Sequence, residues 1–207
     1  MIAQGTDEWL RQRLGRVTAS RMADLLARTK TGYSTSRENY LCDLLIERLT
    51  GNPVEFVKTA AMQHGTDTEP QARAAYEFHH GITVALAEFV PHPRIEMAGC
   101  SPDGYVHADG LVEIKCPSTA THLDTLLGAS IPKKYQDQML WQMACTERTW
   151  CDFVSFDPRL PPHLQLFVTR MERDDVRIKA MEAEVTQFLE ELEQRIEKLN
   201  SLNREAA

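Results

Sequence analysis

Apolar residues recur along the chain with two different spacings, and each spacing predicts a different kind of element. Recurrence every three or four residues predicts helices, whereas short apolar or alternating runs predict strands. Helices are expected over 5–14, from 18 or 20 to 27, and over 39–50, 60–79, 118–127, 132–145 and 173–200. Strands are expected over 82–90, 94–100, 100–106, 111–116, 149–156 and 164–169.

Local signals mark several helix ends. Thr6 or Asp7 is a candidate N-cap for the first helix, and Gly15 follows its last turn. Pro70 lies within 60–79 and removes a backbone donor, so this segment is predicted to be two helices or one helix with a kink.

The last predicted helix, 173–200, is acidic and carries one apolar stripe. The stripe steps by three or four residues through Ile178, Met181, Val185, Phe188, Leu192, Ile196 and Leu199. We expect it to pack against the body of the protein or against a neighbouring subunit. A free coiled coil is less favoured, because the stripe spans few heptads.

Composition indicates an ordinary globular chain. The 207 residues suit one domain over 1–207, with 43% hydrophobic and 26% charged residues. There is no signal-peptide pattern and no apolar run long enough to span a bilayer, so we expect a cytoplasmic protein with no membrane partner. The five scattered cysteines are expected to be reduced thiols rather than a disulfide framework.

The net charge of −7 argues against a protein that coats DNA non-specifically, but it does not exclude a nuclease. Local clustering of basic residues matters more for DNA binding than the net charge. Such a cluster lies near the N-terminus: Arg11, Arg13, Arg16, Arg21, Arg28 and Lys30.

The clearest chemistry lies in the middle of the chain. Asp103 occupies a Pro-Asp-Gly turn, and 100–106 with 111–116 form a predicted hairpin that brings it near Glu113. Glu113 and Lys115 share one strand face, because successive side chains point to opposite faces. Adjacent carboxylates repel unless a cation lies between them, and oxygen ligands suit Mg²⁺ or Mn²⁺. This group predicts metal-assisted phosphodiester hydrolysis; the alternative is an exposed hairpin with a Glu/Lys pair on its solvent face.

The strings Pro-Asp-Gly and Glu-Ile-Lys resemble the signature of the PD-(D/E)XK nuclease superfamily. The fuller strings Cys-Ser-Pro-Asp-Gly (100–104) and Leu-Val-Glu-Ile-Lys-Cys-Pro (111–117) are similar to the phage lambda exonuclease and YqaJ-type viral recombinase branch. The pattern W…RLG…TAS near the N-terminus resembles the same family, and the resemblance covers most of 5–172. It implies an α/β fold with a PD-(D/E)XK restriction-endonuclease-like core, in which a mixed central sheet is flanked by helices.

The resemblance also implies roles for single residues. Asp103, Glu113 and the backbone carbonyl of Ile114 are the implied metal ligands. Lys115 is implied to orient the attacking water or to stabilise charge in the transition state. Glu69, within a helical G…E…AR pattern, is implied to support the metal site directly or through water.

A predicted helix beside this site resembles the family's Y-x-x-Q-x-Q-type helix. Gln138 matches its first glutamine, and its amide is expected to position the attacking water or a phosphate, whereas Leu140 stands where the second glutamine is expected. The alternative for Gln138 is an amphipathic helix with its glutamines outward. A further carboxylate that some family members carry before the Asp103 turn is absent from 91–94, and Glu96 is not expected to replace it.

Arg13 and Ser20 match the family positions that help to hold the 5′-terminal phosphate of DNA. A helix N-terminus with a hydroxyl and a nearby guanidinium is a good anion site on physical grounds. The alternative is that Thr18 or Ser20 only caps a helix and that Arg13 is a surface charge.

The resemblance therefore implies a magnesium-dependent 5′-to-3′ exonuclease that degrades one strand of linear double-stranded DNA and leaves a 3′ overhang for phage-type recombination. Mn²⁺ is expected to substitute for Mg²⁺, and a pair of ions is expected. DNA ends are the expected partner; a homotrimer, a single-strand-annealing recombinase and a bacterial or phage source follow from the resemblance alone. The alternatives are an endonuclease of the same superfamily, an exonuclease with an iron–sulfur cluster, which the scattered cysteines disfavour, and an inactive DNA-end-binding module.

Overall fold

The computed structural model of the protein describes residues 4–54, 57 and 59–202, so the ends of the predicted domain, 1–3 and 203–207, lie outside the described residues. Its largest sheet has the strand order β6-β7-β8-β9. The strands are β6 (Gly104–Val106), β7 (Gly110–Lys115), β8 (Trp150–Phe156) and β9 (Leu166–Glu172). β7 and β8 are parallel and the other pairs are antiparallel, so this sheet is mixed, as predicted.

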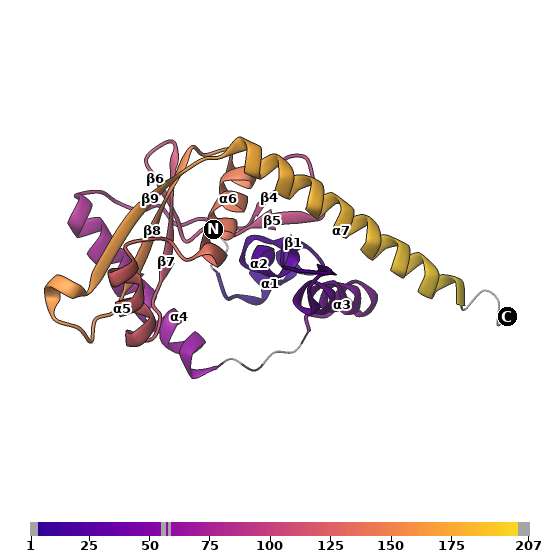
Figure 1. The fold of residues 1–207 in the computed structure, drawn as a ribbon, viewed down its shortest axis with the longest axis horizontal. Coiled ribbons are helices and arrows are strands. Elements are labelled where there is room, and N and C mark those ends of the chain that lie inside the picture. The colour runs from indigo at the N-terminus through magenta and orange to yellow at the C-terminus, as the bar shows by residue number, and fades with distance from the viewer. Residues whose placement is uncertain (1–3, 55–56, 58, 203–207) are drawn as a thin grey trace.

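Three helices cover this sheet: α4 (Ala60–His80), α5 (Thr119–Gly128) and α6 (Lys133–Thr146). α4 lies on one face, where Tyr76 and Ile114 belong to one buried cluster (Figure 1). α6 lies on the other face, where the Tyr135 ring stacks on Phe153 with centroids 5.5 Å apart. α4 runs through Pro70 as one helix, so the predicted division into two helices is wrong. The helices on both faces confirm the predicted fold class.

A second, smaller sheet lies beside the first and has the order β1-β5-β4. Its strands are β1 (Val17–Thr18), β5 (Ala98–Cys100) and β4 (Val90–Pro91). The long strand predicted over 82–90 is wrong, because that segment forms only an isolated bridge from Ala85 to Tyr105 before β4. Val84 and Ala87 of this segment are buried without forming a ladder, whereas Leu86, which alternates with Val84, is exposed.

The strands predicted over 94–100 and 100–106 are also shorter than expected. The chain leaves the small sheet after Cys100 and enters the large sheet at Gly104. The turn that carries Asp103 therefore joins β5, the central strand of the small sheet, to β6, an edge strand of the large sheet.

The chain begins with α1 (Asp7–Arg13), and its predicted start is confirmed: the Thr6 side chain accepts a hydrogen bond from the Trp9 N–H at 3.3 Å. The second predicted helix is much shorter than 18–27. The chain first pairs as β1, then forms one 3₁₀ turn and the four-residue α2 (Met22–Leu25). Thr18 precedes this turn without a side-chain capping bond, and its N–H donates instead to the Tyr40 hydroxyl at 3.0 Å.

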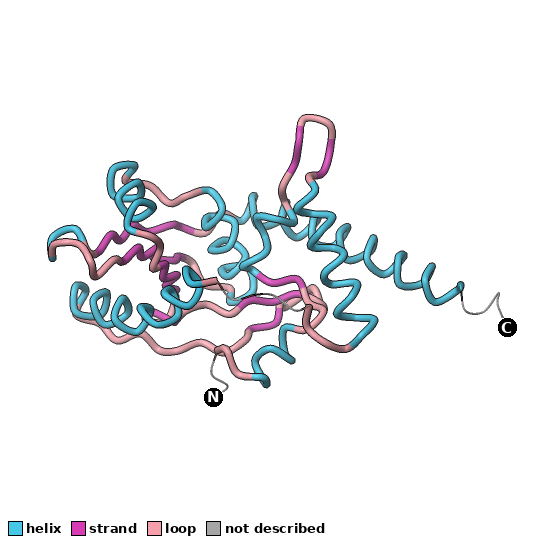
Figure 2. The backbone as a smooth tube through the Cα atoms, turned by 90° about the horizontal axis from the view of Figure 1, so that it is seen from below, coloured by secondary structure: helices cyan, strands magenta, loops and turns pink. Residues whose placement is uncertain are grey.

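α3 (Thr35–Thr50) begins earlier than the predicted 39–50, because Ser34 caps it through a hydrogen bond from the Arg37 N–H. It ends at Gly51, whose φ of 68° is left-handed, as the Gly-Asn-Pro sequence predicts. Between α2 and α3, the short strands β2 (Arg28–Thr29) and β3 (Gly32–Tyr33) form a hairpin that projects from the body (Figure 2).

The C-terminal helix α7 (Asp175–Leu202) crosses α3 and extends past it (Figure 1). The Phe188 ring stacks on Tyr40 with centroids 5.4 Å apart, and Arg37 forms an ion pair with Glu191 at 2.7 Å. Five residues of the predicted stripe are buried: Ile178, Met181, Val185, Phe188 and Leu192. The stripe therefore packs on the body of the protein, and only its end is open, where Leu199 is 40% exposed.

None of the helices that the structure describes has the length and apolarity that a membrane span requires. All five cysteines carry free thiols, as predicted.

Candidate active site

The predicted hairpin is confirmed, and it brings Asp103 to the strand that carries Glu113. β6 and β7 pair with Gly104 opposite Val112. Asp103 Oδ2 accepts a hydrogen bond from the Ile114 N–H at 2.6 Å. Gly104, the next residue, permits the close approach of the Val84 segment to β6, because a Cβ there would lie only 2.1 Å from Val84 Cγ1.

Glu113 is completely buried, and both of its carboxylate oxygens are held by α6. Gln138 Nε2 donates to Oε1 and Gln142 Nε2 donates to Oε2, each at 2.6 Å. The Lys115 ammonium forms an ion pair with Oε1. Glu113 and Lys115 therefore do share one face of β7, and the alternative of a solvent-exposed Glu/Lys pair is wrong for this hairpin.

Lys115 keeps its positive charge despite being mostly buried. Burial lowers the pKa of the Lys115 ammonium, but the Glu113 and Asp103 carboxylates outweigh this effect and raise the pKa overall. The ammonium also lies 5.1 Å from the centre of the Tyr135 ring. A lysine cation is thus fixed beside two carboxylates at the end of a buried strand.

The carboxylates of this group resist joint ionisation. Burial raises the pKa of Asp103 well above its usual value, and the neighbouring Glu113 and Glu69 raise it further. Burial also raises the pKa of Glu69, although the positive charge of Arg73, which donates a hydrogen bond to Glu69 at 2.6 Å, opposes the shift. α4 therefore brings Glu69 to the same group, and we call Asp103, Glu113, Lys115 and Glu69 the carboxylate cluster.

The donor atoms of the carboxylate cluster suit a hard divalent cation. Glu113 and Glu69 both raise the pKa of Asp103 by repulsion, and a cation beside the carboxylates would relieve that repulsion. Within the described residues, no group of three or more His, Cys, Asp or Glu side chains is arranged so that it could hold a metal ion. A site built from Asp103, Glu113 and the Ile114 carbonyl needs only two such side chains, so the oxygen atoms of these residues suit the cation. Their role as metal ligands stays a prediction.

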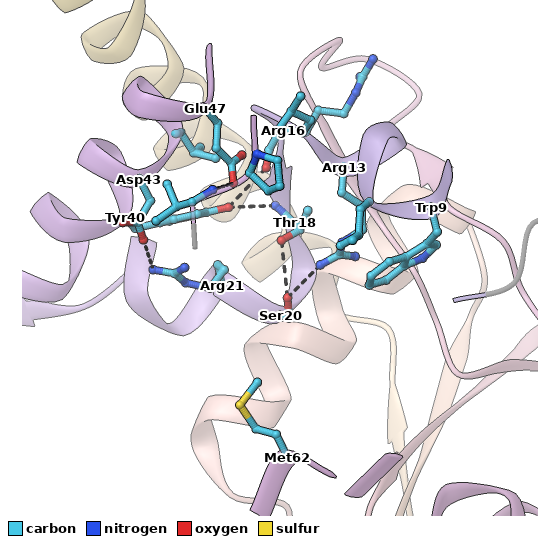
Figure 3. A pocket seen from close by; sticks show the side chains of 15 residues that line it. Trp9, Arg13, Arg16, Thr18, Ser20, Arg21, Tyr40, Asp43, Glu47 and Met62 are labelled. Carbon is cyan, nitrogen blue, oxygen red and sulfur yellow. Dashed lines mark hydrogen bonds and ion pairs between the residues drawn. The ribbon is translucent and has the colours of Figure 1, made fainter. Parts of the chain in front are cut away.

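A cavity of about 500 Å³ lies between the N-terminal elements, α3 and Met62 of α4, and we call it the Arg13 pocket. Figure 3 shows the Arg13 guanidinium and the Ser20 hydroxyl turned toward one another, with the Trp9 ring beside Arg13. Arg13 Nη2 donates to Ser20 Oγ at 3.3 Å, and the guanidinium lies 4.2 Å from the centre of the Trp9 ring. The structure thus brings together the two residues predicted to bind a phosphate.

Arg13 has no carboxylate partner among the ion pairs of the described residues. Burial lowers the pKa of Arg13, and the nearby Tyr40, Cys100 and Glu47 only partly offset this. Its hydrogen bonds go to hydroxyl groups, which leave its charge uncompensated. The Arg13 pocket therefore favours an anion.

Ser101 connects the Arg13 pocket to the carboxylate cluster. Its Oγ accepts hydrogen bonds from Arg13 Nη1 at 3.1 Å and from Trp9 Nε1 at 3.0 Å. Ser101 precedes Asp103 by only two residues. The two sites thus adjoin through one turn of the chain.

Sequence reasoning missed the roles of Gln142 and Ser101. Gln142 lies one helical turn after Gln138, and this i,i+4 spacing is the signal that could have indicated a shared target. Leu140, where the family pattern has its second glutamine, is buried in the core. Glu96 is exposed, its backbone carbonyl accepts a hydrogen bond from Arg16, and among the contacts of the described residues none joins it to the carboxylate cluster.

Comparisons with known proteins identify a family and similar folds. The YqaJ-like viral recombinase domain matches residues 8–149. An alkaline exonuclease (LHK-Exo) from Laribacter hongkongensis is similar in structure, with a TM-score of 0.91 and 48% identity over 98% of this chain and 100% of that chain. Its complex with dAMP matches with a TM-score of 0.92 at the same identity and coverage.

A phage related exonuclease from Haemophilus somnus 129PT matches with a TM-score of 0.74 over 89% of this chain and 96% of that chain. Its identity of 16% shows a shared fold alone. A search of curated proteins gave no match.

Proposed function

Because this chain belongs to the YqaJ-like viral recombinase family, we propose that it is a magnesium-dependent exonuclease that acts in recombination. It degrades one strand of linear double-stranded DNA from 5′ to 3′ and leaves a 3′ single-stranded overhang. The similar structure from Laribacter hongkongensis is an alkaline exonuclease, and its 48% identity over 98% of this chain supports the nuclease assignment.

One observation carries this proposal: the anion site and the carboxylate cluster adjoin through Ser101. The Arg13 guanidinium donates to the hydroxyl of a residue that lies two positions before Asp103. A terminal phosphate bound by Arg13 and Ser20 would hold the strand end beside the carboxylate cluster. An enzyme that cuts internal bonds has no need for such an end-binding pocket.

Asp103, Glu113 and the Ile114 carbonyl would hold the divalent cation, and Glu69 would support a second ion. When bound, Mg²⁺ or Mn²⁺ polarises a phosphoryl oxygen as a Lewis acid. Asp103 is itself held in place by the Ile114 N–H at 2.6 Å. The protein thus presents its ligands on a rigid hairpin.

Lys115 supplies the positive charge next to these ligands. Its ammonium is fixed by Glu113, and it stabilises the negative charge that develops on the phosphoryl oxygens or orients the attacking water. Gln138 is half-buried, so its amide can meet a phosphate or a water at the open side of the site.

The Arg13 pocket supports the 5′-to-3′ direction that the family resemblance implies. A guanidinium and a phosphate form a strong charge-assisted pair, and the Ser20 hydroxyl adds a further hydrogen bond. A pocket of this kind holds a phosphorylated 5′ end, so cleavage proceeds away from that end. A homotrimeric assembly, a single-strand-annealing partner and a cytoplasmic location rest on the family resemblance alone.

A comparison of linear and covalently closed circular duplexes, each with Mg²⁺ or with EDTA, tests the proposal. We expect linear DNA to be degraded with Mg²⁺, and closed circles and EDTA samples to stay intact. Cleavage of the circles would indicate an endonuclease of the same superfamily. Binding of DNA ends without cleavage under all conditions would indicate an inactive end-binding module.

A further inference from the structure

Gln142 is a fully buried amide behind the carboxylate cluster. It has 0% exposure, and its Nε2 donates to Glu113 Oε2 at 2.6 Å. The other buried residues of α6 are apolar: Met139, Leu140, Trp141, Met143, Ala144 and Cys145. A buried polar side chain among these apolar residues therefore needs a physical reason, either in the packing of the core or in a specific contact.

Packing does not supply that reason. Gln142 Oε1 is buried and accepts no hydrogen bond from any residue that the structure describes. A buried amide with one unsatisfied half lowers the stability of the fold unless its other half makes a hydrogen bond that offsets the cost. What Gln142 provides is its hydrogen bond to Glu113.

The two amides of α6 hold different oxygens of Glu113. Oε1 accepts from Gln138 and also pairs with Lys115, whereas Oε2 accepts from Gln142. Each carboxylate oxygen has two acceptor positions. Among the contacts that the structure describes, the position left over on Glu113 is therefore on Oε2, the oxygen that Gln142 orients.

We propose that Gln142 is a positioning residue for the divalent cation: it fixes the Glu113 carboxylate so that Oε2 is available as a ligand. Gln142 is buried beneath Glu113 and does not itself meet the cation or DNA. The inference rests on the proposed function, because that function assigns Glu113 to the cation. Residues that orient metal ligands typically change metal affinity or activity by about 10-fold to 100-fold when they are replaced.

The test compares Gln142→Met, which keeps the side-chain length but removes the donor, with the control Leu140→Met. Leu140 is fully buried on the same helix, and a Leu-to-Met change conserves volume. Calorimetry measures Mn²⁺ binding to the whole protein without DNA, and a Mg²⁺ titration of duplex cleavage gives kcat and KM. We expect Gln142→Met to bind Mn²⁺ at least about 10-fold more weakly. Its KM for DNA should stay unchanged and excess Mg²⁺ should restore cleavage, while Leu140→Met behaves like the wild type.

Equal Mn²⁺ affinity in Gln142→Met and wild type would overturn the proposal, and so would an equal loss in Leu140→Met. Thermal melting shows whether each variant folds. If Gln142→Met does not fold, Gln142→Asn, whose shorter amide cannot reach Glu113, takes its place in the same measurements. If neither folds, Gln142 is a structural residue and the proposal is wrong.

The same data separate this proposal from the proposed function. A wild-type protein that binds Mn²⁺ but does not cleave DNA contradicts the nuclease assignment, while the variants still decide whether Gln142 positions Glu113. A wild-type protein that cleaves DNA with Mg²⁺ while the affinity of Gln142→Met is unchanged contradicts only the role of Gln142. Absence of Mn²⁺ binding in the wild type overturns the role of Gln142, and the cleavage assay then judges the function by itself.

Discussion

The carboxylate cluster and the Arg13 pocket adjoin through Ser101, but they carry opposite charges. In the cluster, burial and the neighbouring Glu113 raise the pKa of Asp103, so its carboxylate resists ionisation. In the pocket, burial lowers the pKa of Arg13, so its guanidinium is less stable as a cation. In both regions the fold disfavours the charged form, and a ligand of the opposite charge would relieve that cost.

An ordinary ion pair of the same protein behaves differently. Burial alone would raise the pKa of Asp157, but hydrogen bonds from Arg159 and Thr119 lower it to about 2. Asp157 in turn raises the pKa of Arg159. Charges that are compensated within the chain thus stabilise the fold. The unfavourable charges of Asp103 and Arg13 support our proposal that the first region binds a cation and the second an anion.

The largest expected effect comes from removing charges of the carboxylate cluster. Asp103→Ala, Glu113→Ala and Lys115→Ala should each lower kcat on linear duplex by roughly 10³-fold, because each removes a cation ligand or a group that stabilises transition-state charge. Single-turnover cleavage at saturating Mg²⁺ measures the effect. Asp109→Ala is the matched control, since Asp109 is exposed in the turn of the same hairpin. A wild-type rate in any one of the three variants removes that residue from the site.

The Arg13 pocket is tested by the chemistry of the DNA end. Arg13→Ala should lower the preference for 5′-phosphorylated over 5′-hydroxyl duplex by about 10-fold to 100-fold, the size of a charged hydrogen bond. The ratio of kcat/KM on the two substrates, at one salt concentration, gives the preference. Arg11 is an exposed arginine on the same helix, so Arg11→Ala is the control and should retain the preference for the phosphorylated end. If the wild type does not distinguish the two ends, the pocket assignment fails.

The compensated pair provides a reference for stability. Asp157→Asn should lower the free energy of unfolding by about 2 kcal/mol near neutral pH, because it removes a carboxylate whose pKa is depressed by its partners. A depressed carboxylate pKa stabilises the fold above the unfolded pKa of about 4, and this contribution is lost as the pH falls toward 2. Urea denaturation of both proteins at several pH values checks this. A difference that stays constant down to about pH 2 would contradict the ion-pair explanation.

The smallest expected effect is a stabilisation within the carboxylate cluster. Folding raises the pKa of the Asp103 carboxyl. The folded state therefore loses stability as the pH rises from the ordinary pKa of Asp103 in the unfolded chain through its raised pKa in the folded protein. Asp103→Asn removes this loss and should raise Tm in EDTA by a few degrees at neutral pH. Added Mg²⁺ should stabilise the wild type and shrink the difference. A lower Tm for Asp103→Asn in EDTA would show that Asp103 is compensated within the chain.

Local signals were sufficient to predict the hairpin and the placement of its charged side chains. A Pro-Asp-Gly turn and the alternation of Glu113, Ile114 and Lys115 are properties of adjacent residues, and the structure places these side chains as expected. The caps at Thr6 and Gly51 were predictable for the same reason. The site residues on other elements were identified by resemblance, because a glutamate or glutamine on a helix does not indicate which strand it faces.

Features that depend on tertiary packing were not predictable. The alternation in 82–90 indicates burial, but it does not show that a neighbouring strand is available, and among the described residues only Ala85 and, at the end of the segment, Val90 pair with one. Ser101 bonds to Arg13 across 88 positions of sequence, and Gln142 bonds to Glu113 across 29. Such contacts appear only once α1 and α6 have packed around the hairpin.

The direction of degradation tests the central claim most directly. The substrate is a linear duplex with 5′-phosphates and a label on the 3′ end of one strand, incubated with Mg²⁺ and sampled over time. We predict that the labelled strand shortens progressively from its unlabelled 5′ end, so that long labelled fragments precede short ones. Release of labelled mononucleotide in the first samples would show degradation from the 3′ end and would contradict the account.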